Sequence, residues 1–122
     1  MTTTETYASS AVQRTMVVVA APPDASTASG ASGVDGCVGT GAYAELAAGE
    51  VVRVVDGSGA LITSVELGPG RLSGQAGGCS WSAEVSLPTD RGSYRALIEG
   101  WGRSGLLSVE DLYRPIVITP GG

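Results

Sequence analysis

Cys79-Ser80-Trp81-Ser82-Ala83-Glu84-Val85-Ser86-Leu87 is the stretch of sequence that decides the fold. The side chains at its odd-numbered positions are apolar, and those between them are serine or glutamate. Successive side chains of a β-strand point to opposite faces of its sheet, so this strict alternation predicts a strand with one buried and one solvated face. Pro88 cannot donate a hydrogen bond to a sheet ladder and is expected to end the strand.

Other strands are expected on both sides of this one. Before it, residues 49–55 and 60–67 flank a glycine-rich turn at residues 56–59, a pattern typical of a β-hairpin. After it, residues 93–102 and 116–119 predict two more strands. Six or seven strands then fit into about 85 residues, which predicts an all-β domain with one short helical turn. The domain should be a small antiparallel β-sandwich or a partly closed barrel.

The short helical turn is expected just before the last strand. Ser108 is suited to cap it, acidic residues follow in its first turn, and Leu112 and Tyr113 should share one side. This turn is the expected cover for the partly apolar strand face that carries Leu97 and Trp101. Trp101 and Tyr113 either pack on each other beneath it or, with Leu97, form a surface for a partner.

The composition changes near residue 34. Residues 1–33 are rich in Thr, Ser and Ala and contain one apolar segment at residues 16–21, which is far shorter than the roughly 20 residues of a membrane span. We therefore predict a low-complexity N-terminal arm or linker at residues 1–33, a β-sandwich domain at residues 34–122, and no transmembrane span. For the apolar segment itself, a strand or ordered arm and a vestigial export signal remain the alternatives.

Two cysteines, Cys37 and Cys79, lie in separate predicted elements. In a small domain rich in short strands they look like a single disulfide. Closing a loop of this length would stabilise the fold by about 4 kcal/mol in the chain-entropy model. Two buried reduced thiols are the alternative and would indicate the cytosol. A metal site is disfavoured because two cysteines without histidine fall short of four ligands.

Composition excludes several classes of function. The chain has 122 residues, a net charge of −5 and no histidine. Without histidine there is no Ser-His-Asp or Cys-His catalytic pair and no imidazole metal ligand. The acidic balance argues against nucleic acid as a partner, because such binding requires a basic face. We expect no enzymatic activity, no cofactor and no metal.

The order of features from Cys37 onward resembles the small β-domain at the C-terminal end of actinobacterial cell-envelope lipoproteins and single-span membrane proteins. The matching elements are Cys37, the turn at residues 41–49, the hairpin at residues 52–59, Cys79-Ser80-Trp81, and the acidic turn at residues 107–112. The resemblance implies this fold, the Cys37–Cys79 bond and an extracytoplasmic location. It carries over no catalytic or ligand-binding residues.

These observations favour a non-enzymatic, extracytoplasmic domain that binds a protein or another envelope component, or supports an assembly. Leu97, Trp101 and Tyr113 are the candidate partner surface. The alternatives are a particle or virion surface protein with an ordered N-terminal arm and, less favoured, a small hydrolase that uses carboxylates alone. An assembly protein needs the arm extended away from its core, whereas a hydrolase needs two carboxylates converging in a pocket.

Overall fold

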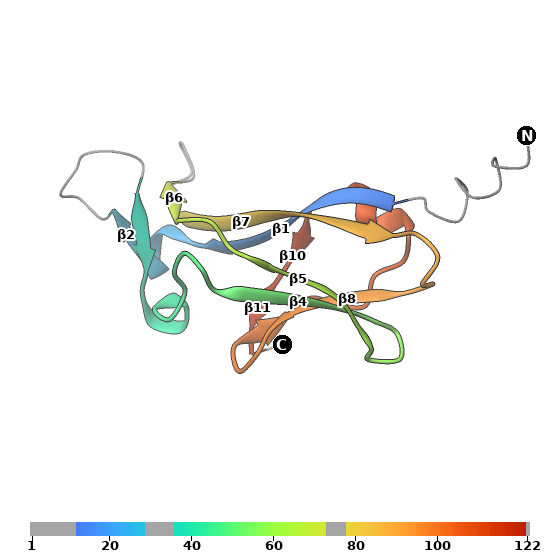
Figure 1. Cartoon of the computed structure of the whole chain (residues 1–122). Helices are drawn as coiled ribbons and strands as arrows, with labels where there is room; N and C mark the ends of the chain where they lie inside the picture. Colours follow the sequence, from blue (N-terminus) through green and yellow to red (C-terminus); the bar gives the residue numbers. More distant parts are fainter. Residues whose placement is uncertain (1–11, 29–35, 73–77, 122) are drawn as a thin grey trace, which may run out of the picture.

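The computed structural model describes residues 12–28, 36–72 and 78–121, which form two β-sheets packed face to face (Figure 1). One sheet has the strand order β10 (Ile116–Val117), β1 (Val12–Ala21), β7 (Cys79–Pro88), β6 (Arg71–Leu72). The other has the order β11 (Thr119–Pro120), β9 (Gly102–Arg103), β8 (Tyr94–Ile98), β4 (Val51–Asp56), β5 (Leu61–Glu66). The sheets do not close into a barrel, so the predicted β-sandwich is confirmed and the barrel alternative is wrong.

Shorter elements lie at the ends of the sandwich. A two-stranded sheet is formed by β2 (Ser26–Ala28) and β3 (Cys37–Gly39). The described segments also include the short 3₁₀ helices η1 (Pro23–Ala25), η2 (Gly41–Tyr43) and η4 (Glu110–Tyr113). The described residues thus contain more strands than the sequence predicted, because several strands have only two or three residues and leave no periodic signal.

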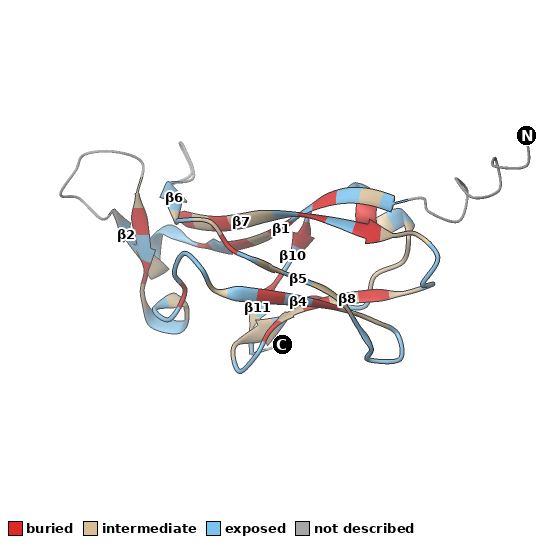
Figure 2. Ribbon diagram, in the orientation of Figure 1, coloured by how far each residue is buried: buried red, intermediate tan, exposed pale blue. Residues whose placement is uncertain are grey.

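The alternating strand behaves as its sequence predicts. In β7, Cys79, Trp81, Val85 and Leu87 are buried, Ala83 on the same face is half-buried against the core, and the serines and glutamate between them are half-buried or exposed. Trp81 is only 1% exposed and lies in the single hydrophobic core cluster between the two sheets. Buried residues alternate with half-buried or exposed ones along much of β1 and β7 in one layer and of β4 and β8 in the other (Figure 2).

The N-terminal strand is where the structure departs furthest from the sequence-based prediction. β1 pairs antiparallel with β7 along its whole length, and it also pairs in parallel with β10. Val17, Val19 and Ala21 contribute to the buried core. The predicted arm is therefore wrong for residues 12–28, because residues 12–21 form a strand of the sandwich and residues 26–28 pair with β3. The rest of that arm lies outside the described residues. Of the alternatives for the apolar segment, the strand is the one that the structure shows.

The predicted strand at residues 93–102 is a hairpin. β8 ends at Ile98, the amide of Trp101 donates to the carbonyl oxygen of Ile98 at 2.9 Å, and β9 begins at Gly102. Gly100 has a φ of +77°, a conformation that favours glycine and permits this tight reversal. Trp101 consequently sits at the tip of a turn and not within a strand.

The predicted helical turn is present as η4, but it covers a different surface from the one expected. It packs against β1, with Leu112 fully buried in the core. A 3₁₀ helix has three residues per turn, so Val109 aligns with Leu112, whereas Tyr113 is displaced from that side. Tyr113 is 68% exposed. The outer face of β8 is therefore left without the expected cover from this helix.

Cys37 and Cys79 form a disulfide, as predicted, with a Cα–Cα distance of 5.8 Å. The bond attaches the small β2–β3 sheet to the start of β7. Gly70 packs directly against it: a Cβ atom at this position would lie 2.8 Å from the Sγ atom of Cys79. The glycine-rich sequence before β7 thus includes a residue that lets the chain pass close to the disulfide.

Candidate functional site

The outer face of the five-stranded sheet places three arginines around one leucine. Leu97 of β8 pairs with Arg53 of β4 on one side and with Arg103 of β9 on the other. Arg95 precedes Leu97 by two residues on the same strand, and Glu99 follows it by two. Side chains two apart along a strand share a face, so Arg95 lies on the same side of the sheet as Leu97. Glu99 lies in the turn after β8, where its ion pair with Arg53 brings it to the same face. We call these five residues the Leu97 cluster.

A shallow depression of about 570 Å³ lies over this cluster. Its lining includes Arg53, Leu97, Glu99 and Arg103, together with Trp101 from the hairpin tip. A smaller depression of about 380 Å³ adjoins it and shares Arg53 and Glu99. Half-buried apolar side chains therefore lie beside charged groups on a surface wide enough for a ligand or a partner.

Trp101 is held in place from outside its own hairpin. Its indole Nε1 donates to the carbonyl oxygen of Ala42 at 2.7 Å, and its ring meets Tyr43 edge to face with the centroids 5.6 Å apart. Both partners belong to η2. Edge-to-face contacts of this kind stabilise aromatic pairs. Trp101 therefore presents a fixed ring to the depression. The sequence-based alternative in which Trp101 packs on Tyr113 is wrong, because its aromatic partner is Tyr43.

Charge within the Leu97 cluster is only partly neutralised. Arg53 pairs with Glu99 at 2.9 Å, and both side chains are more than half exposed to solvent. Neither Arg95 nor Arg103 forms an ion pair or a side-chain hydrogen bond among the described residues. The Nε atom of Arg95 is buried and has no hydrogen-bond partner there. Two positive charges are therefore available to a ligand on this face.

The remaining arginines show how unusual this arrangement is within the chain. All seven lie in the described part of the chain, and Arg14, Arg91 and Arg114 each pair with an acidic side chain. Counting ion pairs between described residues alone, only Arg71, which lies on β6 in the other sheet, resembles Arg95 and Arg103 in having none. In a chain of net charge −5, two unpaired arginines beside Leu97 form a local positive surface.

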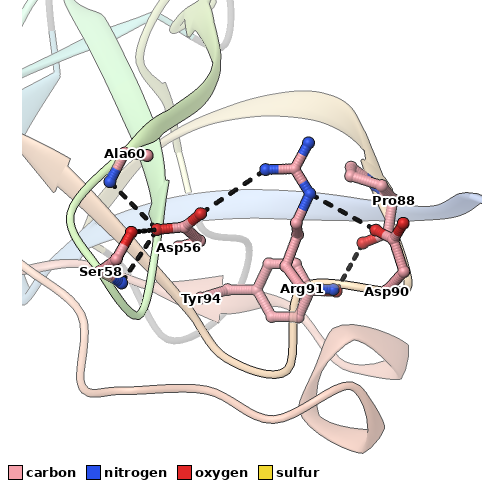
Figure 3. A network of polar contacts seen from close by, with 7 residues as sticks. All are labelled: Asp56, Ser58, Ala60, Pro88, Asp90, Arg91 and Tyr94. Atoms are coloured by element: carbon pink, nitrogen blue, oxygen red, sulfur yellow. Dashed lines mark hydrogen bonds and ion pairs between the residues drawn. The ribbon is translucent and has the colours of Figure 1, made fainter.

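A second group of charges has a structural role (Figure 3). The Oδ1 atom of Asp56 accepts hydrogen bonds from the hydroxyl of Ser58 at 2.7 Å and from the amide of Ala60 at 3.0 Å. The guanidinium group of Arg91 forms two ion pairs. Its Nη1 atom lies 3.6 Å from Oδ2 of Asp56, and its Nε atom lies 3.4 Å from Oδ1 of Asp90. The hydrogen bonds from Ser58 and Ala60 are the main cause that lowers the pKa of Asp56 below its ordinary value.

Tyr94 completes this network from the core side. Its hydroxyl donates to the carbonyl oxygen of Pro88 at 2.5 Å and accepts from the amide of Arg91 at 3.2 Å (Figure 3). The network therefore joins the β4–β5 turn to the β7–β8 connection, which lie far apart in the sequence. Each polar group already has a partner within the protein, so we interpret the network as a brace and not as a ligand site.

Two carboxylates, Glu50 and Glu99, line the smaller depression and are the arrangement that most resembles a carboxylate-only hydrolase. Glu99 is ion-paired with Arg53, and its side chain is 74% exposed. Catalytic carboxyl groups are usually tuned by burial. No such burial is present at Glu99.

Comparisons with protein-family models, curated proteins and solved structures find no match to this chain. Within residues 12–28, 36–72 and 78–121, no helix has the length and apolar character needed to cross a membrane. The same residues contain no group of three or more His, Cys, Asp or Glu side chains that could hold a metal ion. The function is therefore inferred from the side chains of the Leu97 cluster and its surroundings.

The sequence identified part of this site. Leu97 and Trp101, two of the three predicted partner-surface residues, line the same depression. Tyr113, the third, lies on η4 and is not part of that lining. The arginines were missed because their proximity depends on the register between β4, β8 and β9, which no local pattern specifies. The available signal was the alternation of Arg95, Leu97 and Glu99 along one strand.

Proposed function

We propose that this chain is a non-enzymatic, extracytoplasmic binding domain that recognises a protein or another envelope component through the Leu97 cluster and Trp101. The observation that carries the proposal is one shallow depression that holds a half-buried leucine, a fixed tryptophan and the unpaired Arg103, with the unpaired Arg95 next to it on the same sheet face. Tryptophan and arginine are enriched among the residues that dominate binding energy at protein interfaces. Relationship to the actinobacterial envelope domain remains part of this proposal.

The extracytoplasmic location is supported by the disulfide. Disulfides persist in oxidising compartments and are rare in the cytosol, where thiols are kept reduced. The Cys37–Cys79 bond is buried, and no free cysteine is present in the described residues. A secreted or envelope-exposed domain fits these properties.

The alternative of a particle or virion protein with an extended N-terminal arm has less support. Such an arm would leave its own core to contact neighbouring subunits, but β1 is paired on both sides with strands of its own chain. This leaves binding through the outer face of the other sheet as the better-supported function.

Site-specific photocrosslinking in the cells that make the protein tests the proposal. A benzophenone amino acid at position 97 would report on the proposed face, and the same residue in place of Val117 would report on the opposite sheet. Val117 is exposed and Leu97 is half-buried on the outer face, so a probe at either position reaches solvent. We expect adducts from position 97 and none from position 117, with both variants melting like the wild type. Adducts from position 117 alone, or from neither position, would overturn the proposal.

A further inference from the structure

The positive groups around Leu97 have a spacing that selects among ligands. Arg103 lies directly opposite Leu97 on the neighbouring strand, so Arg103 and Arg95 are diagonal neighbours. Diagonal residues of paired strands are about 7–8 Å apart. Side chains two residues apart on an extended peptide are separated by about 7 Å. The two positions that carry the unpaired arginines are therefore spaced like two alternate side chains on one side of an extended segment, so each arginine can face one carboxylate.

From this geometry we infer that the Leu97 cluster binds an extended acidic segment of a partner protein. Two carboxylates and one apolar side chain of that segment occupy every second position and so share one face. This inference rests on the proposed function and names its ligand. Arg95 and Arg103 would each form charge-assisted hydrogen bonds with a carboxylate.

The apolar part of the depression supports a peptide over a dense polyanion. Leu97, Val55 and Trp101 supply surface that a phosphate polymer or nucleic acid would leave uncovered. Glu99, in the turn after β8, and the net charge of −5 would repel a ligand carrying many closely spaced negative charges. A segment with two carboxylates and an apolar side chain matches both the charged and the apolar groups.

The test uses the full chain and a fluorescein-labelled peptide with the sequence Ser-Glu-Ser-Glu-Ser-Leu, which places two glutamates and a leucine on one face of an extended chain. The matched control peptide has glutamine in place of each glutamate. By fluorescence anisotropy at low salt, we expect the acidic peptide to bind at least about tenfold more tightly than the glutamine peptide, and salt to weaken its binding. Equal binding of the two peptides would overturn the inference.

Arg103→Gln and Arg71→Gln form a matched pair of protein variants. Both arginines are exposed, lie in two-residue strands and have no ion pair among the described residues, but they belong to different sheets. We expect Arg103→Gln to weaken peptide binding by about tenfold and Arg71→Gln to leave it unchanged. The same loss in both variants would show that net charge, and not this face, governs binding, and would overturn the inference.

Two further arms separate this inference from the proposed function. Inorganic polyphosphate and vesicles containing anionic lipid are offered to the wild-type chain under the same conditions. Tighter binding of either than of the peptide would overturn the assignment of the ligand. If the peptide fails while position 97 still crosslinks in cells, the ligand class is wrong and the binding face stands. If position 97 does not crosslink, the proposed function is wrong, and the inference that rests on it is wrong as well.

Discussion

The hydroxyl of Thr15 in β1 donates to the carbonyl oxygen of Arg114, just before β10, at a distance of 3.0 Å. The two residues are 99 positions apart, and Thr15 is buried. Next to this bond, Val17 pairs with Ile116 in the parallel ladder between the two strands. The first described strand and the C-terminal segment therefore stabilise each other, and the fold needs both to complete one sheet.

A chain that begins at residue 34 should not fold cooperatively. It would lack β1, which is the central partner of both β7 and β10, and would expose the apolar side chains of β7 that β1 now covers. Thermal unfolding followed by circular dichroism should show no cooperative transition for this chain. The sequence-based division at residue 33 would have predicted a normal transition.

A chain that begins at Val12 is the control, because it retains every described strand. We expect its melting temperature to lie close to that of the full chain. If the chain from residue 34 melts as cooperatively as this control, the contribution of β1 to the core is not required and our interpretation of the sandwich is wrong.

The predictability of this fold from sequence depended on how much each strand reveals locally. β7 was predictable because it has ten residues, with one face buried and the other half-buried or exposed. β1 has the same length, but its apolar residues cluster at 16–21, where a run of valines masks the alternation of Val17, Val19 and Ala21 in the buried face. The serine, threonine and alanine around this run are typical of a linker. The run is nevertheless part of a central strand, because β1 pairs with both β7 and β10.

The candidate site was less predictable than the fold. Leu97 was identifiable because an apolar residue stood on a face that otherwise carried charges. The pairing of Trp101 with Tyr43 was not, since it joins a hairpin tip to a 3₁₀ helix across a long stretch of sequence. Arg53 and Arg103 became neighbours of Leu97 only through the register of three strands. Long-range register of this kind is set by the whole sheet and not by any one segment.

Trp81→Ala should destabilise the protein far more than Trp101→Ala. Trp81 is 1% exposed, and truncating a buried tryptophan typically costs about 3–5 kcal/mol in the free energy of unfolding. Trp101 is half-buried and would lose its contact with Tyr43 and one hydrogen bond. Denaturant unfolding of both variants measures the difference. Equal losses would show that the outer face of the five-stranded sheet is as tightly packed as the core.

Trp101→Phe isolates the hydrogen bond to Ala42. The substitution keeps an aromatic ring beside Tyr43 and removes the indole donor, whose bond to the carbonyl oxygen of Ala42 measures 2.7 Å, together with the smaller ring of the indole. A single hydrogen bond of this type contributes about 1 kcal/mol to the free energy of unfolding. We expect a loss of that size in denaturant unfolding. A loss as large as that of Trp101→Ala would show that ring packing contributes little.

Asp56→Asn should reduce stability at neutral pH but not in acid. The pKa of Asp56 is lowered chiefly by the Ser58 hydroxyl and the Ala60 amide, so its ionised form is favoured in the folded state. The resulting stabilisation is fully present above the ordinary pKa of an aspartate, about 3.9, and is lost as the pH falls through the lower folded-state value. The difference in melting temperature between the wild type and the variant should therefore begin to shrink as the pH falls below about 4 and vanish only below the lowered folded-state pKa of Asp56.

Asp24→Asn is the control for this pH dependence. Asp24 is exposed on η1 and has no ion pair among the described residues. Its substitution should leave the melting temperature nearly unchanged at both neutral and acidic pH. If Asp24→Asn and Asp56→Asn show the same pH profile, then the network around Asp56 does not contribute specifically to stability.

Reducing the Cys37–Cys79 bond should lower the melting temperature by roughly 10 °C or more. The two cysteines are 42 residues apart in sequence, and closing a loop of that length restricts the unfolded chain by about 4 kcal/mol in the chain-entropy model. Even half of that value shifts the melting temperature of a domain this small by about 10 °C. The structure adds a local reason, because the bond joins the two-stranded β2–β3 sheet to β7.

Alkylation of the native protein without reductant, followed by intact-mass measurement, checks that the bond is present. Cys79 is fully buried, so the same alkylation must be repeated in denaturant to expose any free thiol. We expect no modified cysteine in either sample and two modified cysteines only after reduction. Two alkylated thiols in denaturant alone would contradict the disulfide and remove the main physical support for an extracytoplasmic location.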